Sequence, residues 1–526
     1  MLLRNLKSTA LVAALALAIG AAHAADSTPL PEIGSSAAQL ISPAEEARYG
    51  REMLGEFRRF GYLVEDPLVE AWLQELGHRL AARSDRPEQS FRFFMVQSRE
   101  INAFATLGGY VGMNAGLVML AEREDEVAAV LAHEVSHATQ RHIVRSVEAA
   151  QKDALPITLA MLGALVAAQQ AGGDGDASQA AIAGGMALMQ QRQINYTRSN
   201  EHEADRIGIQ ILSRSGFDPL AMADFFGRLL RATRSQGDAV PDYLRTHPVT
   251  TTRISEAKDR AAKIEPQVKR TPAPLHSSIN PMLPGAWQSE VDLVSGPNQA
   301  LFELARERLR VGSAATPTEA LAAYRSDGVT SESQRYGRAL ALIANGQPEP
   351  ALAILDELYQ GSLQASDSHR LWFAVPRAEA MFRAGRVADS EQAFESLLLQ
   401  YPRNRAVALS YAQMLIEKNT GESGQRAQRI LRPLLANDLD DAFMQTSFAR
   451  ASELAGDVIR AAEAHAEAAF LSGRAEDALN QLVRLKERED LDYVQRSRVD
   501  ARIAEMTPVV LELRKRGIRP GDPRRL

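Results

Sequence analysis

Residues 130–137 read Val-Leu-Ala-His-Glu-Val-Ser-His, and the helix that they predict decides the fold. The stretch places His-Glu-x-x-His inside an apolar run that favours a helix. Residues four apart lie on one face of a helix, so His133 and His137 can offer two imidazoles to one metal ion, with Glu134 beside them. Two nitrogen ligands and a neighbouring carboxylate are the arrangement that a zinc hydrolase needs. Because the pattern also occurs by chance, it needs support from the rest of the chain.

The N-terminus predicts export. Arg4 and Lys7 precede an apolar core at 10–19, and Ala-His-Ala at 22–24 is a cleavage signal, so residues 1–24 are expected to be a signal peptide that is removed. An uncleaved membrane anchor is the alternative, but the apolar core is short for a membrane span. We therefore expect the periplasm of a Gram-negative bacterium, or secretion.

Composition excludes several classes of protein. The chain of 526 residues is long enough for two or more domains. Its formal charge of -6 becomes -8 when the two cations of the signal peptide are removed, which gives no support for nucleic-acid binding. It contains no cysteine, which excludes disulfides, a lipid anchor on cysteine, and thiolate ligands or nucleophiles.

A first folded domain is predicted at 42–264, after a flexible lead-in at 25–41 that is rich in small residues, Pro and Ser. Apolar spacing predicts two helices and then three strands, at 42–60, 67–83, 91–96, 101–106 and 110–114. Glycines join the last two strands. An exposed edge strand here could bind a peptide by strand addition, although an ordinary hairpin is the simpler interpretation.

The metal helix is predicted over 122–146, with acidic residues in its first turns, where the helix dipole favours them. His142 lies five residues after His137, so it is expected to point away from the ligand face as a structural or surface histidine. The next segment, 154–190, is apolar at both ends with a glycine-rich centre. A buried helix pair with a mobile loop is the favoured interpretation, and a lid or a membrane-leaning surface is the alternative.

The C-terminal half predicts a second domain at 299–510, after a Pro-, Ser- and Gly-rich linker at 265–298 and before a tail at 511–526. It has helical periodicity throughout. Glycines recur there at intervals of 39, 36 and 35 residues, at Gly346, Gly385, Gly421 and Gly456. This spacing is close to the helix pairs of ~34 residues in tetratricopeptide repeats, which stack into an α-solenoid with a concave binding face. An irregular helical bundle is the alternative.

A catalytic zinc site needs three protein ligands and one open position. With no cysteine in the chain, the ligand that joins His133 and His137 must be His, Asp or Glu. Glu201 is the best candidate, because it starts Glu-x-x-x-Asp in a second predicted helix. Asp205 lies one turn further along the same face, where it can accept a hydrogen bond from a ligand histidine and fix its tautomer. The two motifs together are far more specific than either alone.

Four motifs together resemble the zinc metallopeptidase family of the CAAX prenyl proteases and the heat-shock protease HtpX. In chain order they are Asn102-Ala103-Phe104, His133-Glu134-Val135-Ser136-His137, Glu201-His202-Glu203-Ala204-Asp205 and Thr246-His247-Pro248. Periplasmic members with C-terminal tetratricopeptide repeats share the order of domains expected here. The resemblance implies a mainly α fold with a small β-sheet (α+β), in which an HExxH metallopeptidase domain precedes an α-solenoid.

The resemblance also implies a mechanism with one zinc ion (Zn2+) per chain, although related divalent ions could bind the same nitrogen and oxygen ligands. Glu134 would take a proton from the attacking water and return it to the leaving amine. His247 would occupy the fourth zinc position and hold the enzyme latent. An alternative is that His247 or Arg253 stabilises the oxyanion, and Asn102 is a further candidate for an oxyanion or substrate contact. A loop histidine without a catalytic role also remains open for His247.

The partners are implied by the resemblance alone. It implies outer-membrane protein quality control, in which unfolded or stalled β-barrel proteins are degraded and others are helped to assemble. The repeats would bind these clients and the barrel-assembly complex. A second hypothesis is a chaperone or scaffold whose metal site is mostly silent, and a peripheral membrane contact also stays open. A general regulator of membrane-protein turnover would need transmembrane helices.

Overall fold

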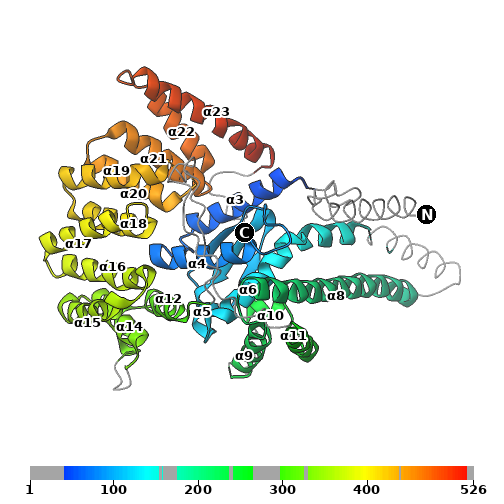
Figure 1. Cartoon of the computed structure of the whole chain (residues 1–526). Helices are drawn as coiled ribbons and strands as arrows, with labels where there is room; N and C mark the ends of the chain where they lie inside the picture. Colours follow the sequence, from blue (N-terminus) through cyan, green and yellow to red (C-terminus); the bar gives the residue numbers. More distant parts are fainter. Residues whose placement is uncertain are drawn as a thin grey trace, which may run out of the picture. The chain divides into compact units, whose positions relative to one another are not determined.

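The computed structural model describes residues 41–152, 157, 175–235, 241–264, 297–324, 330–436 and 440–517. The predicted signal peptide, nearly all of the lead-in and linker, and the last part of the C-terminal tail lie outside the described residues. So does most of the apolar run after the metal helix. From Pro43 onward the chain forms one unit by its contacts. That unit is mainly helical with one small β-sheet, as predicted (Figure 1).

The sheet contains β1 (Arg92–Val96), β2 (Ala103–Ala105) and β3 (Tyr110–Asn114). Its order is β1-β3-β2, with β1 parallel and β2 antiparallel to β3. The predicted hairpin is therefore confirmed, with the 3₁₀ turn η2 (Leu107–Gly109) between its strands. β2 pairs on one side only, so its other edge faces away from the sheet.

Four helices pack around this sheet, and the last of them is the predicted metal helix. They are α3 (Pro43–Arg59), α4 (Pro67–Ala81), α5 (Ala115–Leu120) and α6 (Glu124–Thr139). The Asp66 side chain caps α4 by accepting from the N–H groups of Leu68 and Val69, both at 3.1 Å. α4 then packs between β1 and α6 through its buried apolar face.

The metal helix is shorter than predicted. α6 ends at Thr139, not at 146, and Arg141 has a φ of 52°, in the left-handed region. Residues 142–152 form a separate helical stretch. An ion pair between Arg141 and Glu46 of α3 holds this unfavourable backbone conformation in place. The chain therefore changes direction between His137 and His142.

Of the prediction for 154–190, the second helix is confirmed and its burial is wrong, while nearly all of the first apolar run lies outside the described residues. α8 (Gly175–Arg214) is one helix of 40 residues that begins in the expected glycine-rich loop and continues through Glu201 and Asp205. In its first part, the side chains whose burial the structure describes are exposed as far as residue 195, with Met186 at 63%. Among the described helices, none is long and apolar enough to cross a membrane. The helices α9 (Ala221–Ser235), α10 (Asp242–Thr246) and α11 (Thr251–Lys263) follow.

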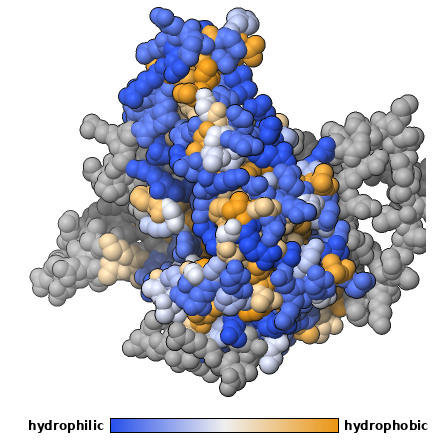
Figure 2. All heavy atoms as spheres, turned by 90° about the vertical axis from the view of Figure 1, so that its left-hand side faces the viewer, coloured by the Kyte–Doolittle hydropathy of each residue, from blue (hydrophilic) through white to orange (hydrophobic). Residues whose placement is uncertain are grey.

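The C-terminal half is an array of helices, and from α14 to α23 each packs against the next (Figure 1). Their bounds are α12 (Gln299–Gly312), α13 (Pro317–Ala322), α14 (Glu332–Ala344), α15 (Pro348–Gly361), η4 (Ser362–Gln364), α16 (Asp367–Arg383), α17 (Val387–Gln400), α18 (Arg405–Lys418), α19 (Gly421–Leu435), α20 (Ala442–Leu454), α21 (Val458–Leu471), α22 (Ala475–Lys486) and α23 (Tyr493–Lys515). α23 extends into residues predicted as the tail. On the side shown in Figure 2 the surface is mainly hydrophilic, with small separate apolar patches.

α12 joins the two halves. Its Phe302 is fully buried against Trp72 of α4, with ring centroids 6.3 Å apart. The Trp72 indole N–H donates to Glu124 at the start of α6, at 2.8 Å. Arg308 reaches the α4 cap, with Nε 2.6 Å from an Asp66 oxygen. One hydrophobic cluster therefore runs through both halves.

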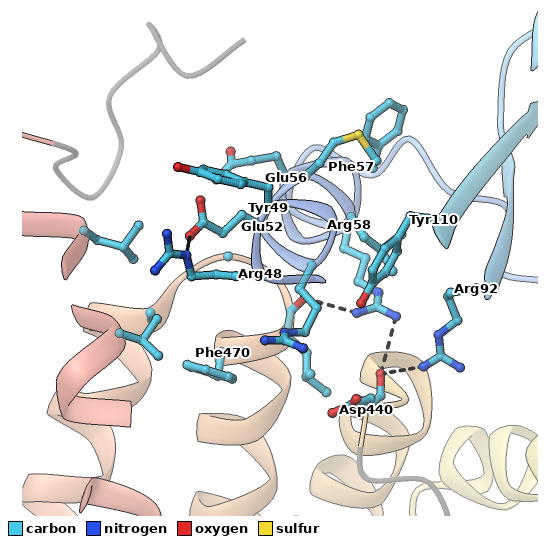
Figure 3. Close-up of a pocket in the computed structure, with 18 of the residues that line it drawn as sticks. Arg48, Tyr49, Glu52, Glu56, Phe57, Arg58, Arg92, Tyr110, Asp440 and Phe470 are labelled. Carbon is cyan, nitrogen blue, oxygen red and sulfur yellow. Dashed lines mark hydrogen bonds and ion pairs between the residues drawn. The ribbon is translucent and has the colours of Figure 1, made fainter. Parts of the chain in front are cut away.

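A second junction places α3 against the last helices of the array. Gly55 and Gly473 allow their backbones to approach closely, because a Cβ on Gly55 would lie 2.8 Å from the Gly473 nitrogen. Beside this contact is a cavity of about 520 Å³ between α3 and α21–α23 (Figure 3). Arg58 and Arg92 both donate to the Asp440 carbonyl there, at 3.5 and 3.1 Å. None of the predicted site residues lines this cavity.

Candidate metal centre

The two histidines of α6 face one point. His133 is 1% exposed, and its Nε2 lies 3.0 Å from Nε2 of His137, one turn later on the same face. The apolar side of α6, including Val127, Leu131 and Val135, is fully buried and fixes the rotation of the helix. The sequence pattern thus produces the expected pair of imidazoles in the interior of the protein.

α8 brings Glu201 to the same point. Its carboxylate oxygens lie 3.4 Å from His133 Nε2 and 3.3 Å from His137 Nε2. The close packing of α6 and α8 depends on Gly208, where a Cβ would stand 3.2 Å from the His133 backbone nitrogen. A small residue two turns after Glu201 therefore lets the carboxylate reach both imidazoles.

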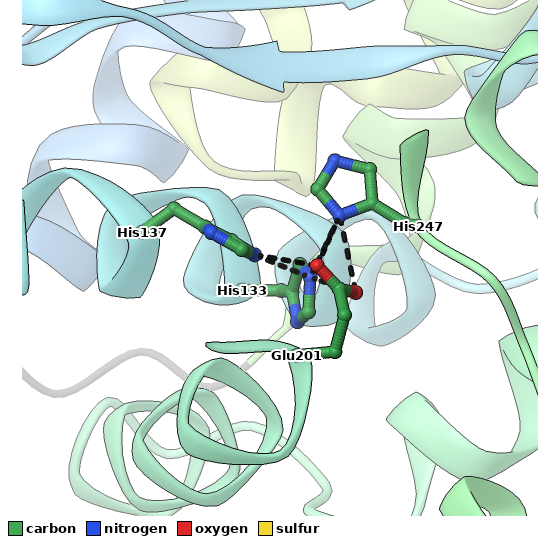
Figure 4. Close-up of side chains that lie close together, drawn as sticks. All are labelled: His133, His137, Glu201 and His247. Carbon is green, nitrogen blue, oxygen red and sulfur yellow. Dashed lines mark hydrogen bonds and ion pairs between the residues drawn. The ribbon is translucent and has the colours of Figure 1, made fainter. Parts of the chain in front are cut away.

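His247 follows α10 and completes a group of four. Its Nδ1 lies 3.0 Å from Glu201 and 3.3 Å from His133 Nε2 (Figure 4). The buried ring of Tyr243 stacks on the His247 ring, with centroids 4.8 Å apart, and the Tyr243 carbonyl accepts from the His247 N–H at 2.7 Å. These contacts hold the imidazole over the other three side chains.

The four side chains fit a zinc ion. Their ligand atoms all lie within 4.8 Å of one another, and the individual separations given above run from 3.0 to 3.4 Å. Tetrahedral zinc with bonds of about 2.0–2.1 Å places its ligands ~3.3–3.4 Å apart. Three imidazole nitrogens and one carboxylate oxygen are ligand types that zinc accepts. The arrangement would therefore offer a metal ion four protein ligands and leave no open position.

The charges in the site favour a cation at its centre. Burial opposes ionisation of Glu201, but His247, His133 and His137 outweigh it and hold the pKa of Glu201 well below its usual value. Burial lowers the pKa of His137. For His133, hydrogen bonds with Asp205 and Glu201 outweigh burial and raise the pKa to about 10. A metal ion would replace the proton that these carboxylates stabilise.

Asp205 and Arg253 lie behind the ligands. Asp205 is 3.0 Å from His133 Nδ1, the nitrogen that faces away from the centre. Arg253 of α11 donates twice to Asp205, both times at 2.7 Å, and its Nη1 lies 2.9 Å from Glu201. The same Nη1 donates to the Pro248 carbonyl at 2.8 Å, directly after His247. Arg253 is 2% exposed, and these contacts engage all three nitrogens of its guanidinium group.

Glu134 lies beside the four ligands and outside them. Its Oε2 accepts from the Ala105 N–H of edge strand β2 at 2.8 Å, and its Oε1 lies 3.6 Å from His247 Nε2. Among the described residues, Oε1 has no hydrogen-bond partner. One oxygen of Glu134 is thus fixed by the sheet, while the other faces the side where His247 lies.

Asn102 precedes β2, and its main-chain carbonyl accepts from the Asn114 N–H at 2.9 Å. Its side-chain oxygen is buried and has no hydrogen-bond partner among the described residues. The structure thus brings seven of the eight predicted site residues into mutual contact, and Asn102 is the one for which it records no such contact.

Sequence reasoning missed the contact of His142. The turn at Arg141 brings His142 back toward α6, where its Nδ1 lies 2.9 Å from Nδ1 of His137. Its Nε2 lies 3.2 Å from Glu203. His142 is 3% exposed, so it is a buried neighbour of a ligand and not a surface residue. No glycine or proline lies between His137 and His142, so the sequence gives no signal of the turn.

Comparisons with known proteins find one family model that matches the peptidase half and relatives that match nearly the whole chain. The sequence model of Peptidase family M48 matches residues 67–261, which include every predicted site residue. The "Beta-barrel assembly-enhancing protease" of Yersinia pestis is 30% identical over 489 residues, 92% of this chain and 93% of the relative. That of Escherichia coli K12 is 29% identical over 503 residues, 96% of each chain. "Mitochondrial metalloendopeptidase OMA1" of Schizosaccharomyces pombe is 29% identical over 205 residues, 39% of this chain and 56% of the relative.

Proposed function

The chain belongs to peptidase family M48 and is a metalloendopeptidase, and we propose that it is a zinc enzyme of the periplasm that cleaves misassembled outer-membrane β-barrel proteins. The names of the relatives that match it over more than nine-tenths of its length support a metallopeptidase role in outer-membrane assembly. The predicted signal peptide supports export, and the helical array supports tetratricopeptide repeats that bind clients and the barrel-assembly complex.

His133, His137 and Glu201 are proposed to hold the zinc ion. When bound, zinc would polarise a water molecule and the carbonyl group of the peptide bond. Glu134 takes the proton of that water and returns it to the leaving amine. Because the Ala105 N–H holds Oε2 of Glu134, Oε1 is the oxygen available for this transfer. Asp205 lies 3.0 Å from His133 Nδ1, where its carboxylate would favour the tautomer that directs Nε2 of this ring at the metal.

The observation that carries the proposal is the position of His247. Its Nδ1 lies 3.0 Å from Glu201 and 3.3 Å from His133 Nε2, and its Nε2 is 3.6 Å from the proposed base Glu134. A fourth protein ligand fills the position that water and substrate need. The described arrangement therefore corresponds to a latent enzyme, in which His247 must move before cleavage begins.

The closed arrangement also favours a second candidate function. If His247 stays on the metal under working conditions, the protein acts as a chaperone or scaffold for β-barrel assembly and its metal site is largely silent. The two functions differ in whether chelator-sensitive proteolysis occurs at all.

The test compares four proteins: wild type, His247→Ala, Glu134→Gln and the control His202→Ala. His202 is next to Glu201 in sequence, but its side chain is 38% exposed and pairs with Glu256. Cleavage of casein and of an unfolded β-barrel protein is measured with and without a chelator, together with zinc content. We expect His247→Ala to cleave faster than wild type, and His202→Ala to cleave at the wild-type rate. Loss of cleavage in His247→Ala with zinc retained would contradict the latent-ligand proposal, and chelator-insensitive cleavage would contradict the metallopeptidase mechanism.

A further inference from the structure

The two α6 ligands are supported in different ways. His133 contacts a carboxylate directly, because Asp205 lies 3.0 Å from its Nδ1. His137 has a histidine in the equivalent place, with His142 Nδ1 at 2.9 Å from its own Nδ1. In metal sites the nitrogen of a ligand imidazole that does not bind the metal usually donates to an oxygen, so a second imidazole in this place needs an explanation.

The direction of the hydrogen bond follows from the metal site. His137 presents Nε2 to the other ligands, 3.0 Å from Nε2 of His133, so Nε2 must carry the lone pair and Nδ1 the proton. His137 Nδ1–H then donates, and the facing Nδ1 of His142 must accept. The proton of His142 is therefore on Nε2, which faces Glu203 at 3.2 Å.

Glu203 closes the series. Its Oε2 accepts from Arg145 Nη1 at 3.0 Å, as well as lying next to His142 Nε2. The guanidinium group keeps the carboxylate ionised, so Glu203 accepts and does not donate. The hydrogen bonds thus determine one another in sequence. Arg145 makes Glu203 an acceptor, and Glu203 then sets the tautomer of His142. His142 in turn sets the tautomer of His137.

We propose that His142 is a positioning residue for the metal site, which holds His137 in the tautomer and ring orientation that bind the metal, with Glu203 and Arg145 behind it. The proposal rests on the proposed function, because it concerns the same metal site. It gives each acidic residue of the Glu-x-Glu-x-Asp stretch of α8 a separate task. Glu201 is a ligand, Asp205 positions His133, and Glu203 positions His137 through His142.

The backbone turn at Arg141 supports a positioning role for His142. Residues 142–152 do not continue α6, because Arg141 has a φ of 52° and the chain turns there. A continued helix would place His142, five residues after His137, well away from the ligand face. The left-handed residue is unfavourable for a side chain larger than glycine, and the Arg141–Glu46 ion pair holds it. Its structural effect is to bring His142 against His137.

The test measures zinc affinity and not catalysis. We compare wild type with His142→Leu, which fills the space but cannot accept, and His142→Asn, whose side-chain oxygen can take the place of Nδ1. Zinc dissociation constants are measured by competition with a chromophoric chelator at pH 7.5. We expect His142→Leu to weaken zinc binding by about 10–100-fold. We expect His142→Asn to recover most of this loss.

The matched control is His202→Leu, the same substitution at an exposed histidine of α8 that pairs with Glu256 at 3.1 Å. It should bind zinc as wild type does. Circular dichroism shows whether each variant is folded, and His142→Asn still tests the proposal if His142→Leu is not.

Two results would overturn the positioning role alone: wild-type affinity in a folded His142→Leu, or equal losses in His142→Leu and His142→Asn, which would show a packing effect. If wild type itself binds no zinc, both this proposal and the proposed function fail. If wild type and His247→Ala both bind zinc but neither cleaves, only the proposed function fails.

Discussion

Replacing Arg253 by Met tests whether this side chain supports the metal site or acts on the substrate. Arg253 is 2% exposed and contacts Asp205 twice at 2.7 Å and Glu201 at 2.9 Å. Removing one partner of a buried ion pair costs about 3–5 kcal/mol, because the other charge stays buried without compensation. In the variant, Asp205 still contacts His133, and Glu201 still contacts the three histidines. We therefore expect a loss of unfolding free energy at the lower end of this range, about 3 kcal/mol for the metal-free protein.

The effect of Arg253→Met on stability should depend on pH in one direction. Burial raises the pKa of Asp205, but Arg253 and His133 outweigh it and hold the pKa below its usual value. A carboxyl with a lowered pKa stabilises the fold above its unfolded pKa of about 3.9, and this contribution is lost as the pH falls through the folded value. The variant has the same unfolded state but a higher folded pKa of Asp205, so the stability difference between wild type and Arg253→Met should be present at pH 7 and shrink as the pH falls from the Asp205 pKa of the variant to the lower one of wild type.

The assay is urea unfolding of the metal-free proteins, followed by fluorescence and circular dichroism. Arg245→Met is the control, because the Arg245 side chain is 67% exposed and its ion pair with Asp242 lies on the surface. Its effect should stay within about 0.5 kcal/mol. If Arg253→Met unfolds like Arg245→Met and binds zinc normally but loses turnover, the reasoning is refuted, and Arg253 acts on the oxyanion.

Three further changes test other parts of the structure. Glu134→Gln should keep one zinc ion per chain by elemental analysis and lose cleavage by at least ~100-fold, and unchanged cleavage would end its assignment as the base. Arg405→Met removes the partner of Glu70 (2.9 Å) and Asp441 (2.5 Å), and should lower the unfolding free energy by about 2–3 kcal/mol at pH 7. Burial raises the pKa of Glu70 and Arg405 opposes this, so the variant should regain stability as the pH falls from 7 to 5, and a loss in this range would contradict the account. Gly55→Ala should cost ~1–3 kcal/mol, because the new Cβ meets the Gly473 backbone at 2.8 Å, whereas Gly312→Ala, with nothing within 4 Å, should be neutral or stabilising in the same unfolding measurement.

The local part of the site could be predicted from the sequence. The spacing of His133, Glu134 and His137 sets their common face on one helix, and the spacing of Glu201 and Asp205 does the same on another. The hairpin was also predictable, because glycines separate two short β-forming runs. In each case the arrangement follows from the spacing of residues that are close together in the sequence.

The parts that could not be predicted depend on single backbone conformations or on contacts between distant residues. The left-handed Arg141 is an ordinary residue in the sequence, yet it decides where His142 lies. α8 begins at Gly175, inside the segment whose glycines predicted a loop, and continues as one helix through Glu201. The engagement of Arg253 by two carboxylates on another helix has no local signal at all.

The position of α12 has a consequence for how this chain can be divided. Phe302 covers Trp72, and the main-chain N–H of Asn298, just before α12, donates to the buried Glu124. A peptidase truncated in the linker would expose the Trp72 indole to water and remove the Asn298 donor of the Glu124 carboxylate, and would be a poor reagent for measuring the intrinsic activity of the site. Chimeras that exchange the C-terminal helical array between relatives should be joined after Gly312, so that α12 stays with the peptidase half.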